Sequence, residues 1–226
     1  EAVAGMDLPD DQRSRLTTRT KALRRETDRL TGILTDFLEF AGQIHLDLRQ
    51  AEVGGVLTEL ADFFTPEAER HGVRLRTQLP DTPILAIFDV KLVKQALLNL
   101  MLNATQAMAS AAAGPAKELL LRPELVKDTD GSSVVKIHVT DTGPGISAET
   151  LPRIFQPYFT TKGGGSGLGL PTSRRLVEEH AGRIDLHSEV GKGSDFVLVL
   201  PVAGPTESRE VGGRGAVGGA GARCDP

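Results

Sequence analysis

The chain has 226 residues, of which 39% are hydrophobic and 25% charged, so it is long enough for one sizeable domain with an appendage and has a globular composition. Its net charge of -4 excludes the global positive field that attracts nucleic acid. No apolar run is long enough to cross a bilayer, and no signal peptide opens the chain.

Cysteine usage and the first residue bound the cellular setting. The only cysteine, Cys224, excludes an internal disulfide and indicates a reducing compartment. Because the chain begins with Glu1 rather than Met, we expect a piece of a longer protein. The sequence therefore predicts a cytoplasmic chain, or the cytoplasmic part of a membrane-anchored one.

Residues 1–43 predict one long helix. Apolar side chains recur every seven residues, at Leu16, Leu23, Leu30 and Phe37. Pro9 and two acids favour a helix start, and Gly42 favours a stop. The repeat persists for four heptads, which favours a helix bundle, with its partner in cis or in trans, over an amphipathic helix lying on the following domain.

Residues 44–202 predict a mixed α/β domain. Helical periodicity covers 53–70, 90–113 and 170–181. Alternating or short apolar runs predict strands at 44–49, 73–79, 84–88, 117–127, 133–140, 183–188 and 196–202. We expect a two-layer α/β sandwich with the helices on one face of a mixed sheet. The glycine-rich segment 203–226 has almost no apolar bulk and is predicted to be disordered.

Two amides, Asn99 and Asn103, lie four residues apart in the otherwise apolar helix 90–113. That spacing places both on one helix face, although Asn is a poor residue for a helix interior. Neutral amide oxygens can bind Mg²⁺ and face phosphates without charge repulsion. A hydrogen-bonded pair between helix and loop is an equally good reading of the two residues alone.

Asp141 follows the predicted strand 133–140 and precedes a turn that contains Gly143 and Gly145. A carboxylate held at a strand end can accept a hydrogen bond from the exocyclic amine of adenine. Glycines beside it allow a flat base to approach the backbone. An ordinary acidic turn residue is the better reading of this segment alone.

The segment 163–170 is glycine-rich and leads directly into a predicted helix. Backbone amides at a helix start form an anion site, and a mobile glycine loop suits a lid over a nucleotide. A flexible linker is the alternative, but an apolar helical stripe follows at once. Just upstream, Lys162 is a candidate phosphate contact or a solvated loop charge. The candidate contacts of the loop itself are Gly165, Ser166, Gly167, Leu168, Gly169 and Leu170.

In this order, the segments resemble the catalytic and ATP-binding domain of bacterial sensor histidine kinases, in the group that includes gyrase, the Hsp90 chaperones and MutL. The resemblance spans about 44–202. Its N box, first glycine box, F box and second glycine box correspond to Gln95–Met108, Asp141–Gly145, Phe155–Lys162 and Gly165–Leu170. It implies a Bergerat-type ATP-binding fold and the cofactors ATP and Mg²⁺.

The resemblance also assigns roles. It implies that Asn103 ligates Mg²⁺, that Asn99 lies near the phosphates and that Asp141, with its glycines, pairs with adenine. It implies that the 165–170 loop, with Thr161 and Lys162, cradles phosphates. No catalytic residue is assigned. Gln106 departs from many kinases, which have a lysine there, and leaves that phosphate contact open.

One position separates kinase from ATPase. The gyrase and Hsp90 branches have a water-activating Glu where this chain has Asn99, and an amide is no general base. We therefore expect a histidine kinase that donates the γ-phosphoryl group of Mg-ATP in a two-component system. The alternatives are an ATP-dependent conformational switch of the Hsp90–MutL type and a degenerate scaffold that dimerises through residues 12–41.

The phosphoacceptor is expected outside this chain. No histidine here is followed by Glu, as the family's acceptor is; the five are His45, His71, His138, His180 and His187. Residues 16–41 resemble the second helix of the dimerisation bundle. The expected partners are a response regulator, an acceptor helix of the same or a partner subunit, and a second copy of the chain.

Overall fold

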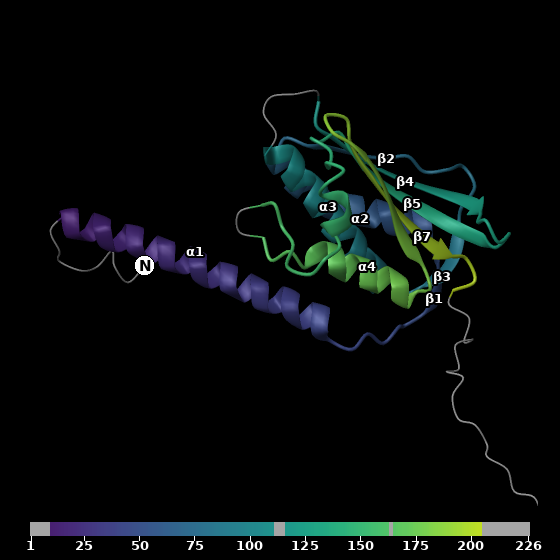
Figure 1. Cartoon of the computed structure of the whole chain (residues 1–226), viewed down its shortest axis with the longest axis horizontal. Coiled ribbons are helices and arrows are strands. Elements are labelled where there is room, and N and C mark those ends of the chain that lie inside the picture. The colour runs from purple at the N-terminus through teal and green to yellow at the C-terminus, as the bar shows by residue number, and fades with distance from the viewer. Residues whose placement is uncertain (1–9, 111–115, 163–164, 205–226) are drawn as a thin grey trace, which may run out of the picture.

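The computed structural model describes residues 10–110, 116–162 and 165–204 (Figure 1). In chain order the elements are α1 (Asp10–Ala41), β1 (Arg49–Glu52), α2 (Val53–Arg70), β2 (Arg74–Thr77), β3 (Leu85–Phe88), α3 (Val90–Ser110), β4 (Glu118–Lys127), β5 (Ser133–Asp141), the 3-10 helix η2 (Leu151–Arg153), α4 (Gly169–Glu179), β6 (Arg183–Glu189) and β7 (Gly193–Pro201). The segment predicted to be disordered lies outside the described residues from position 205 onward.

The predicted long helix is present as α1, which projects from the α/β domain (Figure 1). Its heptad positions face solvent: Leu23 is 69% exposed, Leu30 58% and Phe37 43%. One helix cannot bury such a stripe against itself. The exposed stripe agrees with the bundle prediction, but the partner helix stays a prediction.

A five-stranded mixed sheet, in the order β2-β4-β5-β7-β6, forms one layer of the domain. Only β2 and β4 pair in parallel; the other neighbours are antiparallel. The helices α2, α3 and α4 cover one face of this sheet (Figure 1). Between the layers lie fully buried side chains that include Phe64, Leu97, Ile137 and Leu198. Each large apolar side chain buried there contributes about 1.5–3 kcal/mol.

The predicted strand 44–49 needs correction. Residues 44–48 are not a strand, and β1 pairs only with β3, from Arg49 opposite Phe88 to Glu52 opposite Leu85, in a separate two-stranded sheet. The alternation that suggested a strand arises because Ile44 packs against the core from an irregular linker. The helix α2 then begins at once, because the Glu52 carboxylate accepts from the first amides of the helix.

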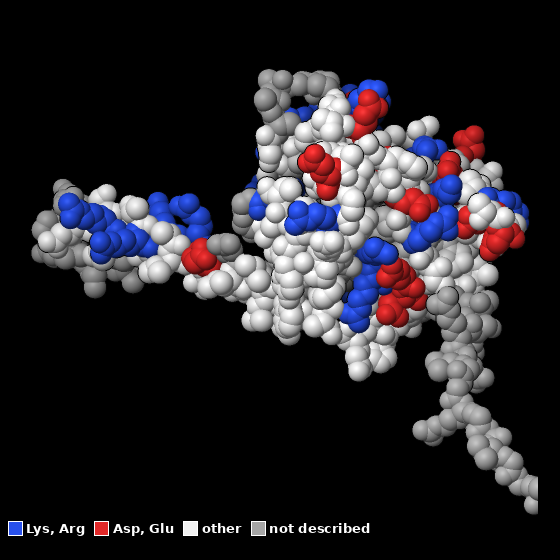
Figure 2. All heavy atoms as spheres, in the orientation of Figure 1, with Lys and Arg blue, Asp and Glu red and all other residues white. Residues whose placement is uncertain are grey.

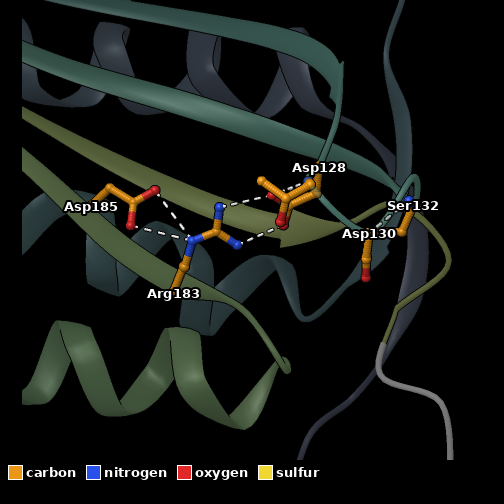
Figure 3. Close-up of polar contacts among 6 residues, drawn as sticks. Asp128, Asp130, Ser132, Arg183 and Asp185 are labelled. Carbon is orange, nitrogen blue, oxygen red and sulfur yellow. Dashed lines mark hydrogen bonds and ion pairs between the residues drawn. The ribbon is translucent and has the colours of Figure 1, made fainter.

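The outer face of the sheet carries polar cross-strand contacts (Figure 3). Arg183, at the start of β6, binds both carboxylate oxygens of Asp128 in the β4–β5 turn, at 2.7 and 3.2 Å, and contacts Asp185 at 3.3 Å. The hydrogen bond from Arg183 lowers the pKa of Asp128. Within the same turn, Asp130 accepts from the Ser132 amide at 2.8 Å. These contacts fix the turn against β6, on the side of the sheet away from the helices.

Charged side chains of both signs are interspersed on the face of the α/β domain that Figure 2 shows. The described residues there form no continuous basic surface, as the acidic composition predicts. Within the described part of the chain, no helix is both long and apolar enough to span a membrane.

Candidate functional site

A cavity of about 1030 Å³ lies between α3, the end of β5 and two segments that precede α4, residues 159–162 and the glycine loop 165–170. The predicted site residues that line it are Asn99, Asn103, Asp141, Gly145, Thr161, Lys162, Gly165, Ser166, Gly167, Gly169 and Leu170. Two predicted residues, Gly143 and Leu168, do not line it. Leu168 is fully buried and anchors the loop, while Gly143 lies behind the Asp141 carboxylate.

The helix α3 presents both predicted amides to this cavity. Its apolar side chains, which include Leu97 and Leu100, are buried in the core, so the polar face is left toward the opening. The Asn99 side chain donates to the Gly169 carbonyl at a long 3.4 Å. Asn99 therefore contacts the glycine loop, whereas Asn103 contacts Lys162.

The side-chain oxygen of Asn103 accepts from the ammonium of Lys162 at 2.5 Å. The same ammonium donates to the Asn103 carbonyl at 3.1 Å and to the Gln106 side chain at 3.2 Å. Burial lowers the pKa of Lys162, and the charge of Asp141 opposes this. The Lys162 ammonium thus places a positive charge beside Gln106, a position at which α3 has an amide and no lysine of its own.

The donor set around Asn103 fits a hard divalent cation. Its amide oxygen faces the cavity, and Mg²⁺ takes such oxygen ligands while it keeps several waters. The Lys162 ammonium binds this oxygen in the present structure, so Mg²⁺ would have to displace it. Among the described residues, no group of three or more His, Cys, Asp or Glu side chains could hold a metal ion. Any Mg²⁺ here would therefore depend on this amide, on water and on oxygens of a bound ligand.

Asp141 is the last residue of β5 and is only 4% exposed. Its carboxylate accepts from the Gly143 amide at 2.8 Å, and Ser194 on β7 also hydrogen bonds to it. Burial is the largest influence and raises the pKa of Asp141, although these hydrogen bonds oppose it. Ser194 was missed by the sequence reading, because only the β5–β7 register brings it opposite Asp141.

Glycines are required around Asp141 for steric reasons. A Cβ on Gly143 would lie 2.6 Å from the Asp141 carboxylate, and Gly193 has φ +114°, with a Cβ position 1.9 Å from the Asp141 carbonyl oxygen. Both glycines therefore let neighbouring backbone close around the carboxylate, which stays fixed at the cavity wall.

The glycine loop enters α4 at Gly169, and the residue at the N-cap, Leu168, makes no side-chain hydrogen bond to the first amides of this helix. Such amides point outward at a helix start and attract anions. Gly167 has φ +69°, and a Cβ there would meet the Tyr158 backbone at 2.6 Å. The loop therefore passes close over the preceding segment before the helix begins.

The aromatic segment 154–159 supports the glycine loop, because the Tyr158 amide donates to the Gly167 carbonyl at 3.0 Å. Phe155 and Phe159 pack against the core, and Arg153 lies 4.4 Å from the centre of the Phe159 ring. Tyr158 is exposed instead. Phe159 and Thr160 also line the cavity, so this segment is both support and wall.

Two residues of the long helix, Gly32 and Ile33, also line the cavity. No sequence signal marks them, because they lie outside the heptad stripe and far from the glycine boxes. They reach the cavity because α1 contacts α4. The cavity thus has one wall outside the α/β sandwich.

Residues 88–204 match the family model of histidine kinase-, DNA gyrase B- and HSP90-like ATPases. The chain belongs to this family. The match begins one residue before Asp89 and therefore includes α3, Asp141 and the glycine loop. It also includes the whole of the sheet except β2.

Within this family, the relatives described next are histidine kinases. The chain is 36% identical over 182 residues to the sensor histidine kinase ZraS of Escherichia coli K12. The aligned region covers 80% of this chain and 37% of that protein. It is 31% identical over 180 residues to the kinase AtoS of the same organism, with 79% of this chain and 28% of that protein covered. The chain thus spans about a third of the curated relatives it matches.

Solved structures agree with the fold. Full-length ShkA, crystallised with AMPPNP, aligns with a TM-score of 0.70 and 29% identity, covering 90% of this chain and 41% of that one. The prediction of a two-layer sandwich with helices on one face of a mixed sheet and a long helix before it is confirmed.

Proposed function

We propose that this chain binds Mg-ATP and donates the γ-phosphoryl group to a histidine in two-component signalling. The observation that carries the proposal is the convergence on one cavity of Asn103, Asp141 and the 165–170 loop. Those three features supply a cation ligand, an adenine acceptor and a phosphate cradle. The similarity to named sensor histidine kinases supports the reaction class.

Each group has a distinct proposed role. The carboxylate of Asp141 accepts from the adenine amine, while Asn103 ligates Mg²⁺ and Asn99 lies near the phosphates. Backbone amides of the loop and of the α4 start bind phosphate oxygens, and Lys162, with Thr161 beside it, contacts them from the lid. Bound Mg²⁺ supplies neutralisation of phosphate charge. The chain itself contributes orientation and electrostatics.

Transfer is favoured over hydrolysis by the residue at position 99. The amide of Asn99 accepts no proton from water, so the site provides no general base at the place where the hydrolytic branches have a Glu. The AMPPNP complex of ShkA supports nucleotide binding by a related site. An ATP-dependent switch of the Hsp90–MutL type is the second candidate.

The proposed function assigns a role to each part of the chain. Residues 1–43 are assigned to part of a dimerisation bundle, with 16–41 in its second helix, 44–202 to the ATP-binding domain and 203–226 to a tail. The exposed heptad stripe of α1 supports a homodimer. A response regulator is the proposed acceptor of the phosphoryl group from histidine, and the cytoplasm is the proposed compartment.

Phosphate release without any acceptor separates the two candidates. We expect slow release by the chain with Mg-ATP, and a higher rate in Asn99→Glu, which adds a carboxylate base. Asn99→Gln is the matched control, because it changes length without adding a base. Efficient phosphate release by the unmodified chain would favour the ATPase switch and contradict the kinase proposal.

A further inference from the structure

The guanidinium of Arg175 on α4 holds the end of α1. One nitrogen donates to the Phe40 carbonyl, and Nη2 donates to the Gly42 carbonyl at 2.8 Å. The last carbonyls of a helix have no partner within the helix and carry partial negative charge. The planar cation, with several donors, binds one such carbonyl, at Phe40, and at the same time the Gly42 carbonyl just after the helix, which a lysine cannot do in the same geometry.

The linker that follows α1 is fixed a second time. The Asp47 amide donates to the buried carboxylate of Asp89 at 2.9 Å. The Asp89 amide in turn donates to Nε2 of His180 at 3.0 Å, and Nδ1 of His180 donates to the Leu176 carbonyl at 2.7 Å. His180 is 1% exposed. Both ends of the linker are therefore connected to α4 or to its C-terminal cap.

The helix α4 begins at the glycine loop 165–170. The single hydroxyl hydrogen of Ser173, one turn into α4, is shared between the Gly169 carbonyl at 3.0 Å and the Ala96 carbonyl of α3 at 3.2 Å. The N-terminal end of α4 is thus fixed to the loop and to α3, while Arg175 contacts α1. A single helix of 11 residues connects the glycine loop to the end of the long helix.

The orientation of α1 matters because Gly32 and Ile33 form part of the cavity wall. Gly32 precedes the helix end at Ala41 by about 14 Å, at 1.5 Å of rise per residue. A tilt of about 10° at the end of α1 would therefore move Gly32 by about 2–3 Å. Phosphoryl transfer depends on placement at the ångström level.

We propose that Arg175 is a positioning residue, which fixes α1 so that Gly32 and Ile33 stay at the wall of the nucleotide cavity. Its consequence for catalysis rests on the proposed kinase function, but the geometry does not. The partner that Arg175 recognises is the pair of carbonyls at the end of α1. Arg175 touches none of the proposed ligand groups and does not line the cavity.

Distances between two spin labels test this geometry directly. In a Cys224→Ser background, labels at Lys21→Cys on α1 and Lys192→Cys in the β6–β7 turn report the angle between α1 and the domain. An excess of unlabelled chain removes signals between copies. We expect a narrow distance distribution with Arg175, at least a twofold broader one in Arg175→Ala, and an intermediate width in Arg175→Lys.

Arg174→Ala is the matched control, because it removes a neighbouring charge on α4 that binds Glu178 instead. We expect its distribution to equal that of the parent. Unfolding midpoints verify that each variant is folded. An unchanged distribution in Arg175→Ala, or equal broadening in Arg174→Ala, would overturn the proposal, whatever the outcome of any phosphorylation assay.

A kinetic comparison links the geometry to transfer. With an acceptor-helix polypeptide, Arg175→Ala should lower kcat at least fivefold with KM for ATP within twofold, and Arg175→Lys should restore part of the loss. A change confined to KM would assign Arg175 to nucleotide binding and contradict the positioning role.

Discussion

Replacing the buried Asp141 carboxylate by an amide should weaken nucleotide binding and stabilise the fold. Because burial raises the pKa of Asp141, the folded chain binds this proton more tightly than the unfolded chain. The ionised carboxylate therefore costs stability at pH values above the raised pKa, and that cost shrinks as the pH falls below the raised pKa and is gone below the pKa of the unfolded chain. Asp141→Asn removes the charge, while its oxygen can still accept from Gly143.

The binding loss follows from the adenine contact. A hydrogen bond to a charged group contributes about 1.5–3 kcal/mol, and the new NH2 group presents a donor to the adenine amine, which also donates. We expect Kd for ATP to rise about 10- to 150-fold. Titration with a fluorescent nucleotide measures this change, and thermal unfolding at neutral and acidic pH measures stability.

Asp62→Asn is the control, because Asp62 is exposed on α2. It should leave both quantities unchanged. The melting temperature of Asp141→Asn should exceed that of the parent at neutral pH, and the difference should vanish toward acidic pH. Tighter or unchanged ATP binding in Asp141→Asn, or a lower melting temperature at neutral pH, would refute this reasoning.

Three further substitutions test other parts of the account. Asn103→Ala should make nucleotide affinity independent of Mg²⁺, measured by titration with Mg²⁺ and with a chelator; a retained Mg²⁺ effect would remove Asn103 from the site. Gly193→Ala should destabilise by about 2 kcal/mol or more, because φ is +114° and the new Cβ meets a carbonyl; urea unfolding measures this, and a neutral result would contradict the backbone argument. Leu97→Ala should cost about 2–5 kcal/mol in the same assay, because Leu97 is fully buried; a cost below 1 kcal/mol would mean the core is looser than described.

Local signals accounted for most helices. The bounds of α2 agree with the predicted range 53–70, because an apolar stripe and a capping Glu52 act within a few residues. The described end of α3 at Ser110 precedes the predicted end, and residues 111–113 lie outside the described part. Strand partners were less accessible, because the separate β1–β3 pairing joins residues that are distant in the sequence.

In the candidate site too, local signals could be predicted from the sequence and contacts between distant residues could not. Residues in glycine-rich or amide-bearing segments, such as Asn103 and Asp141, could be proposed from the sequence because their residue types are unusual for their element, and both line the cavity. Ser194, Gly32 and Ile33 were not predicted, because strand register brings Ser194 to the cavity and the contact of α1 with α4 brings Gly32 and Ile33 there. The contact of Lys162 with Asn103 likewise joins two segments 59 positions apart.

The central claim is that this chain donates a phosphoryl group rather than hydrolysing ATP. The most direct measurement mixes the chain with γ-labelled Mg-ATP and a polypeptide that carries a histidine acceptor helix of its own kinase, and follows acid-labile, base-stable label on that polypeptide alongside released phosphate. The account predicts label on the acceptor in excess of released phosphate, lost in Asn103→Ala. Measurable ATP binding with released phosphate and no phosphohistidine would contradict it.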